Sequence, residues 1–138
     1  MPIRLLTTAA CLLLFSSFAL AAPPAAISDS DSHQRALQSF QSFASNWMQK
    51  MERVEMRNRT SPQIRSYGAR NLITYKGYAG DFQIEIKHTG YAKAPFVGLL
   101  RYKEQLFTCA DERATRCRIA STVPVTEIFR FQDGRWVY

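Results

Sequence analysis

Hydrophobic side chains recur at steps of three and four through residues 33–57. This spacing places them on one stripe of an amphipathic helix: Leu37, Phe40, Phe43, Ala44, Trp47, Met48, Met51 and Val54. Asp31 or Ser32 is the predicted N-cap, and residues 58–62 end the pattern. Because the stripe carries three large aromatics, it needs a broad apolar surface to cover it.

After this segment the hydrophobic period changes to two. Residues 81–88 alternate strictly, with Phe82, Ile84 and Ile86 on one face and polar side chains on the other. Such alternation is typical of a half-buried antiparallel strand. We interpret His88, at the end of the strand, as lying on its polar side.

Further strands are predicted between glycine-containing turns, over residues 72–75, 96–109, 117–131 and 135–138. Gly98 inside the long strand indicates a bulge or close packing beneath the helix, and Pro124 indicates a bulge or an edge position. Asp133 and Gly134 form a two-residue hairpin signal.

One long helix followed by four or five antiparallel strands predicts an α+β fold, in which a curved sheet wraps the helix. We expect residues 33–138 to form a single domain. Residues 22–32 are rich in Ala, Pro, Ser and Asp and show no apolar periodicity, which predicts a flexible leader.

The order of these elements resembles the cystatin-like superfamily, which includes nuclear-transport-factor-like and ketosteroid-isomerase-like folds. Residues 129–136, Phe-Arg-Phe-Gln-Asp-Gly-Arg-Trp, look like the last hairpin of many such domains. The Gln-x-Val-x-Gly loop of protease-inhibiting cystatins is absent. The two or three helices that precede the sheet in pocket-bearing members are here reduced to one. The resemblance implies a pocket between helix and sheet in which an inward acid could act.

The first residues of the chain predict its destination. Residues 5–20 are uncharged and mostly apolar, and Ala19 and Ala21 are small residues at the −3 and −1 positions of a cleavage site after Ala21. This is the pattern of a bacterial-type secretory signal peptide over residues 1–21, and the stretch is shorter than the ~20 apolar residues of a spanning helix. We therefore expect a periplasmic or secreted protein.

The composition adds a strong positive charge to this picture. The chain has 18 Lys and Arg residues against 11 Asp and Glu, a formal charge of +7, and it is 46% hydrophobic and 21% charged. These fractions are ordinary for a globular domain and exclude a wholly disordered chain or a multi-span membrane protein. The basic excess points to an anionic partner.

Cys109 and Cys117 enclose seven residues, four of them charged. In an oxidising compartment such a pair predicts a disulfide at the base of a polar hairpin, worth roughly 2.5 kcal/mol in the chain-entropy account. The spacing is not the Cys-x-x-Cys of oxidoreductases, and no nearby histidine completes a zinc site.

The sequence contains no nucleophile elbow, no glycine-rich phosphate loop, no cluster of metal ligands and no cofactor motif. Two acids, Glu127 and Asp81, are candidate catalytic groups: if either points inwards among aromatics, its pKa rises and it becomes a general base of the isomerase type. Glu85 and His88 could also meet across a pocket, although exposed polar residues are the simpler interpretation.

Basic and aromatic residues alternate in several stretches, as suits an anionic polymer. The candidate anion-binding residues are Arg65, Arg70, Lys76, Arg101, Lys103, Arg130 and Arg135. A simpler interpretation is that the aromatics pack the helix and the cations fill the solvent face. Nucleic acid is an improbable partner, because it is scarce in the expected compartment.

Our first hypothesis is therefore an exported, non-catalytic binding domain of the cell envelope, which engages a partner protein or an anionic envelope component. The alternatives are a pocket-bearing carrier or isomerase-like enzyme and a structural subunit of a surface assembly. A pocket requires unfilled space between five side chains, which a binding module would close: Phe40, Trp47, Phe82, Leu100 and Phe129. Residues 135–138 could form a homodimer through a sheet edge.

Overall fold

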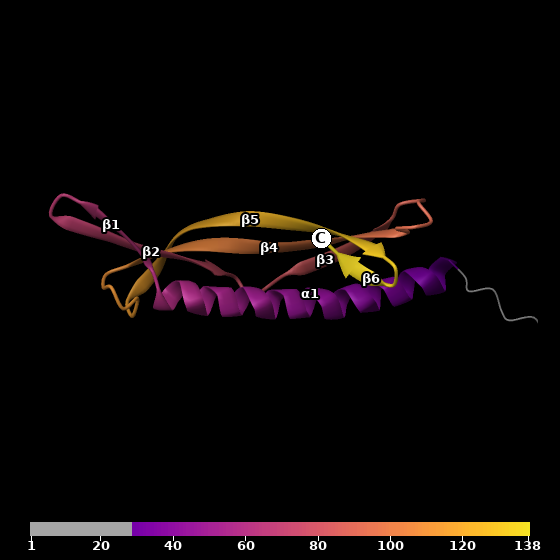
Figure 1. Ribbon diagram of the computed structural model, residues 1–138, viewed down its shortest axis with the longest axis horizontal. Coiled ribbons are helices and arrows are strands. Elements are labelled where there is room, and N and C mark those ends of the chain that lie inside the picture. Colours follow the sequence, from indigo (N-terminus) through magenta and orange to yellow (C-terminus); the bar gives the residue numbers. More distant parts are fainter. Residues whose placement is uncertain (1–28) are drawn as a thin grey trace, which may run out of the picture.

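The computed structural model describes residues 29–138, in which one helix lies along a curled antiparallel sheet (Figure 1). The predicted α+β class is confirmed, with six strands rather than four or five. The elements are α1 (Asp29–Thr60), β1 (Gln63–Tyr67), β2 (Arg70–Tyr78), β3 (Gln83–His88), β4 (Phe96–Cys109), β5 (Cys117–Gln132) and β6 (Arg135–Val137). The predicted signal peptide and most of the predicted leader lie outside the described residues.

The helix α1 is longer than its apolar stripe. It includes Asp31 and Ser32, so the predicted N-cap is wrong: the Ser32 hydroxyl donates to the Asp29 carbonyl at 2.8 Å, inside the first turn. Acidic residues in the first turn and Arg57 and Arg59 in the last complement the helix dipole.

Strand β4 is the centre of the sheet, whose order is β1-β2-β4-β5-β6, with β3 also paired to β4. Strands β2 and β3 follow one another along one edge of β4, and β5 pairs along the other edge. Strand β1 was not predicted, because all five of its residues are exposed and carry no alternation of burial.

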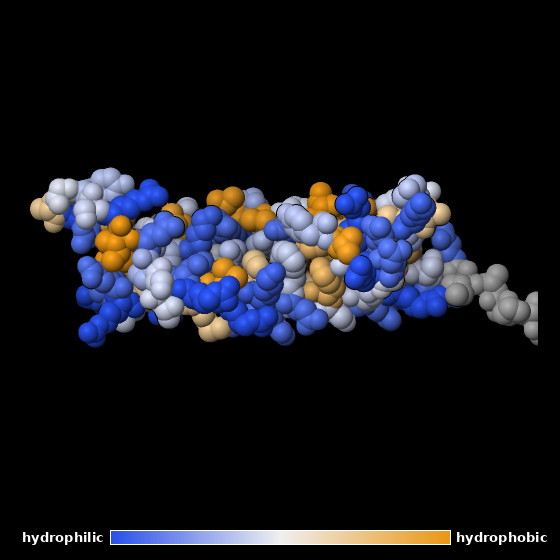
Figure 2. Space-filling view, in the orientation of Figure 1, coloured by the Kyte–Doolittle hydropathy of each residue, from blue (hydrophilic) through white to orange (hydrophobic). Residues whose placement is uncertain are grey.

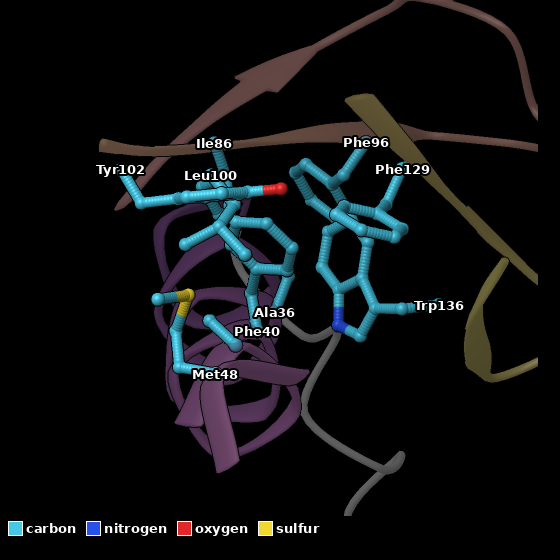
Figure 3. Close-up of a cluster of buried hydrophobic side chains, with 10 residues drawn as sticks. Ala36, Phe40, Met48, Ile86, Phe96, Leu100, Tyr102, Phe129 and Trp136 are labelled. Atoms are coloured by element: carbon cyan, nitrogen blue, oxygen red, sulfur yellow. The ribbon is translucent and has the colours of Figure 1, made fainter. Parts of the chain in front are cut away.

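The main core lies between α1 and the first half of β4. Phe40, Leu100 and Phe129 are fully buried, and Figure 3 shows their side chains gathered with those of Phe96 and Trp136. A Cβ on Gly98 would lie 2.5 Å from the Phe40 ring, so only glycine admits this ring. The predicted close packing beneath the helix is confirmed. Trp136 also belongs to this core, with its ring centroid 4.5 Å from that of Phe40.

A second, smaller core lies at the other end of β4, around Ile73, Tyr75, Cys109 and Ala114. The buried residues in the first half of β4 are even-numbered and face the main core, whereas the buried Cys109 is odd-numbered. Since successive strand residues point to opposite faces, the two cores occupy opposite faces of the sheet. The predicted disulfide, Cys109–Cys117, is confirmed and closes this end.

Side chains of α1 complete the edge of β2 beyond the last residue paired with β1. Asn58 Nδ2 donates to the Lys76 carbonyl at 2.9 Å, and the Tyr78 N–H donates to Glu55 Oε2 at 2.8 Å. A Cβ on Gly77 would lie 2.7 Å from the Glu55 carboxyl carbon. The glycine therefore lets the helix approach closely enough to satisfy these two backbone groups.

Candidate anion-binding face

Three of the seven predicted anion-binding residues pair with acids of the same chain. Lys76 lies 2.9 Å from Glu104, and Lys103 lies 3.5 Å from Asp81. Arg101 lies 2.7 Å from Glu85, and this hydrogen bond lowers the pKa of the Glu85 carboxyl. These cations are partly neutralised within the protein.

The other four predicted cations divide between the two ends of the sheet. Arg65 and Arg70 lie on the β1–β2 hairpin, whereas Arg130 and Arg135 lie on the β5–β6 hairpin. Figure 1 shows these hairpins at opposite ends of the long axis. The seven residues therefore do not form a single basic face.

Strand register brings Arg118, which the sequence did not indicate, onto the same face as the β1–β2 arginines. Gln63 pairs with Thr74, Thr74 with Thr108, and Thr108 with Arg118. Directly opposed residues point to the same face of a sheet, as do residues two apart on one strand. We call the resulting surface the arginine face, and it comprises Arg65, Tyr67, Arg70, Arg116 and Arg118.

Arg116 joins this surface through a hollow that it lines together with Arg118, Thr108 and both cysteines. Asp111 holds the loop that carries it, because its carboxylate accepts the N–H groups of Thr115 and Arg116 at 3.0 and 3.1 Å. These bonds, the Thr115 N–H first, lower the pKa of Asp111. The loop is thus fixed by a carboxylate as well as by the disulfide.

The arginine face is exposed and rich in uncompensated charge. Between described residues, no ion pair involves Arg65, Arg70 or Arg118, and Arg116 meets Asp111 only at 3.7 Å. Tyr67 is 61% exposed beside Arg70, its partner in the register. Guanidinium groups bind phosphate, sulfate or carboxylate in bidentate fashion, and an exposed ring stacks on bases or sugars.

A second hollow extends the same face towards the end of α1. Gln63, Thr74, Lys76 and Leu106 line it, together with Asn58 and other residues. Lys76 pairs with Leu106 across β2 and β4, in the row next to Thr74 and Thr108. A chain-like ligand could therefore follow the sheet from one hollow to the other.

The two candidate catalytic acids lie apart. Glu127 points to the helix side and accepts the Tyr102 hydroxyl at 3.1 Å, while Asp81 is exposed beside Lys103. Burial, followed by the charge of Glu127, raises the pKa of the Tyr102 phenol. A hydrogen bond to Glu127 also raises the pKa of Tyr138. Glu127 thus has the inward orientation considered from the sequence, without Asp81 beside it.

Side chains fill the space among the five residues that a pocket would require, although an open hollow lies beside it between α1 and the β2–β3 connection, lined by Met48, Tyr78, Phe82 and other residues. Phe40, Leu100 and Phe129 are fully buried. Trp47 closes one side, with its ring centroid 4.9 Å from that of Phe129, and Phe82 packs against the same cluster. The arrangement is that of a closed core.

The histidines lie beside Phe96 rather than beside a carboxylate. His88 shares a face with the buried Ile86, so its predicted placement on the polar side is wrong: position 88 is an even number of residues from 86. Its Nδ1 accepts the Gly90 N–H at 3.1 Å, and its ring meets the edge of Phe96 at 5.3 Å. Glu85 lies on the opposite face, so the two do not meet.

Comparisons with models of known protein families, with curated proteins and with solved structures found no match to this chain. Within residues 29–138, no helix has the length and apolar character needed to cross a membrane. In the same part of the chain, no three His, Cys, Asp or Glu side chains are grouped as metal ligands would be.

Proposed function

We propose that this protein is an exported, non-catalytic binding domain that engages an anionic partner through the arginine face. The observation that carries the proposal is the placement of Arg65, Arg70 and Arg118 on one exposed sheet face without an acid to pair with them. Arginines without an acidic partner are free to form hydrogen bonds with an anion, and the disulfide helps to hold the strand that carries Arg118 in place.

The closed core favours this function over a pocket-bearing carrier or isomerase-like enzyme. The side chains that would have to enclose a ligand instead contact one another, as Phe40 and Phe129 do at a centroid distance of 6.1 Å. Glu127 accepts a phenol hydroxyl from its own chain. An enzyme of the isomerase type would need this carboxylate to face a substrate.

The cell envelope is the proposed compartment. The disulfide Cys109–Cys117 is compatible with an oxidising environment. The signal-peptide pattern of residues 1–21 supports export, and the net charge suits an anionic component of the envelope or an acidic protein surface.

Chromatography on immobilised heparin, a sulfated polymer, tests the proposal. We expect the triple variant R65Q/R70Q/R118Q to elute at clearly lower salt than the wild type, because each lost phosphate-like contact reduces the salt-dependent part of binding. The matched control K93Q/R130Q/R135Q removes the same charge from exposed positions at the other end of the molecule. It should elute close to the wild type.

Two results would refute the proposal. An equal shift for both triple variants would mean that only net charge matters. Failure of the wild type to be retained beyond a neutral protein of the same size would remove the anionic partner altogether.

A further inference from the structure

Strand β5 leaves most of one edge unpaired among the described residues. It pairs with β4 along its whole length, whereas β6 covers only residues 130–132 of its other edge. In Figure 1, β5 runs along the side of the sheet away from α1 for most of its length. The sequence predicted a homodimer contact at residues 135–138; among the described residues β6 pairs with β5 alone, so its short outer edge is open as well.

The backbone groups that point out of this edge can be assigned. The Lys103 carbonyl accepts the Ala79 N–H at 2.9 Å, so the backbone of Lys103 faces away from β5. Pro124 is its partner in the register and must therefore face outwards too. Alternate residues share this direction, so Thr122, Thr126 and Ile128 also present their backbone to solvent.

This assignment confirms the predicted edge position of Pro124. The ring removes an N–H that would have pointed to solvent, so the sheet loses no hydrogen bond. The bulge in this strand lies elsewhere, between the partners of Leu106 and Phe107. The edge from Thr122 to Ile128 thus offers three N–H donors and four carbonyl acceptors.

The side chains along the edge indicate which segment could pair with it. Ile119, Val123 and Ile128 are 51%, 53% and 57% exposed, and Figure 2 shows hydrophobic residues along the outline where β5 lies. Arg118 and Arg130 lie at the two ends of the open stretch, and no ion pair with a described acid involves either. The open edge of β5 is therefore apolar in its centre and positively charged at both ends.

A second copy of this chain fits the edge poorly. Two β5 strands paired antiparallel through residues 122–128 would bring residues 118–120 of one copy beside residues 130–132 of the other. Strand β6 already occupies the edge at residues 130–132, so the second copy would collide with it. A short segment with acidic ends fits both the length of the open stretch and the positive charge at its two ends.

We propose that the open edge of β5 binds an extended segment of a partner protein, with β-branched residues at its centre and acidic residues at its ends, which adds as a further strand beside residues 119–128. This inference rests on the proposed function for the anionic nature of the partner. The segment's backbone would bond to Thr122, Thr126 and Ile128, and its carboxylates would reach Arg118 and Arg130.

Arg118 and Arg130 pair with Thr108 and Val97 of β4 and therefore lie on opposite faces of the sheet. The first test uses a synthetic ten-residue peptide whose two glutamates also lie on opposite faces, acetyl-Glu-Thr-Ile-Thr-Val-Thr-Ile-Thr-Val-Glu-amide, and its counterpart with lysine in place of glutamate. We expect the acidic peptide to bind, the lysine peptide to bind at least tenfold more weakly, and only one of the two sets of alternate N-methylated acidic peptides to lose binding. Strand pairing uses alternate amides, so equal effects of both methylation sets would overturn the proposal.

Variants of β5 give the second test. T126P removes an outward N–H and should weaken peptide binding about threefold to tenfold, whereas P124A restores one and should strengthen it by a similar factor. T126A is the control for the lost side chain, and thermal unfolding verifies the fold of each variant. Unchanged affinity for T126P would overturn strand addition.

The two proposals can fail separately. If T126P weakens peptide binding but leaves heparin retention unchanged, the edge and the arginine face act independently and both stand. If the peptide binds T126P as it binds the wild type while R65Q/R70Q/R118Q loses heparin retention, the anionic function stands and strand addition is refuted.

Discussion

Replacing Gly98 by alanine tests the central packing contact of the fold. The new methyl carbon would lie 2.5 Å from two carbons of the Phe40 ring and 2.8 Å from a third. Carbon atoms in good contact are roughly 3.5–4.0 Å apart, so ring and strand must separate by about 1 Å. Phe40 has no free space to retreat into, because it is fully buried against Phe129 and Trp136.

Forcing extra volume into such a core costs about 1–3 kcal/mol. The lower backbone entropy of alanine in the unfolded chain returns only about 0.5–1 kcal/mol. We therefore expect Gly98→Ala to lower the free energy of unfolding by about 1–2 kcal/mol, which for a domain of this size lowers Tm by about 5–10 °C.

Urea and thermal unfolding measure this loss, and two further variants isolate its cause. Gly80→Ala is the matched control, because nothing lies within 4 Å of its added Cβ, and it should leave stability almost unchanged. Combining Gly98→Ala with Phe40→Leu should recover about 1 kcal/mol relative to the sum of the single effects. Wild-type stability for Gly98→Ala, or strict additivity in the double variant, would refute this account of the core.

Two other predictions concern the disulfide and a buried phenol. Replacing Cys109 and Cys117 by serine should lower the free energy of unfolding by about 2–3 kcal/mol, measured in urea, and a midpoint unchanged by the substitutions would contradict this. Tyr102 has a raised pKa in the folded protein, so its contribution to the free energy of unfolding is fully present below pH ~10, the ordinary value, and is lost as pH rises from there towards the folded pKa. Stability should therefore begin to fall as pH rises past about 10, less steeply in Tyr102→Phe, and identical slopes would contradict the assignment.

Periodicity was sufficient to predict the helix and β3, because in each the hydrophobic residues recur on one face. Strand β5 was predicted from the turns around it instead, since residues 118–124 are all exposed. Strand β1 was missed because its residues are all exposed, so neither face leaves a hydrophobic signal. The helix also extends beyond its stripe, because its first turn depends on polar residues such as Ser32.

The arginine face depends on information that local patterns do not carry. Arg65 and Arg118 are far apart in sequence and share a face only because β2 and β4 lie between their strands. The predicted disulfide gave one part of the register, because a bond between Cys109 and Cys117 places the neighbouring residues Thr108 and Arg118 opposite each other. The order of the other strands could not be obtained from the residues themselves.

The two hydrogen bonds from α1 to β2 also determine how the helix can move. A helix held only by apolar contacts can slide along its axis or rotate, since one methyl group substitutes for another. Glu55 and Asn58 instead engage the Tyr78 N–H and the Lys76 carbonyl, which alternate along one strand edge. A shift of one helical turn would break both bonds at once and leave polar groups without partners. The helix therefore has a single axial position, and force applied to it is transmitted directly to the sheet.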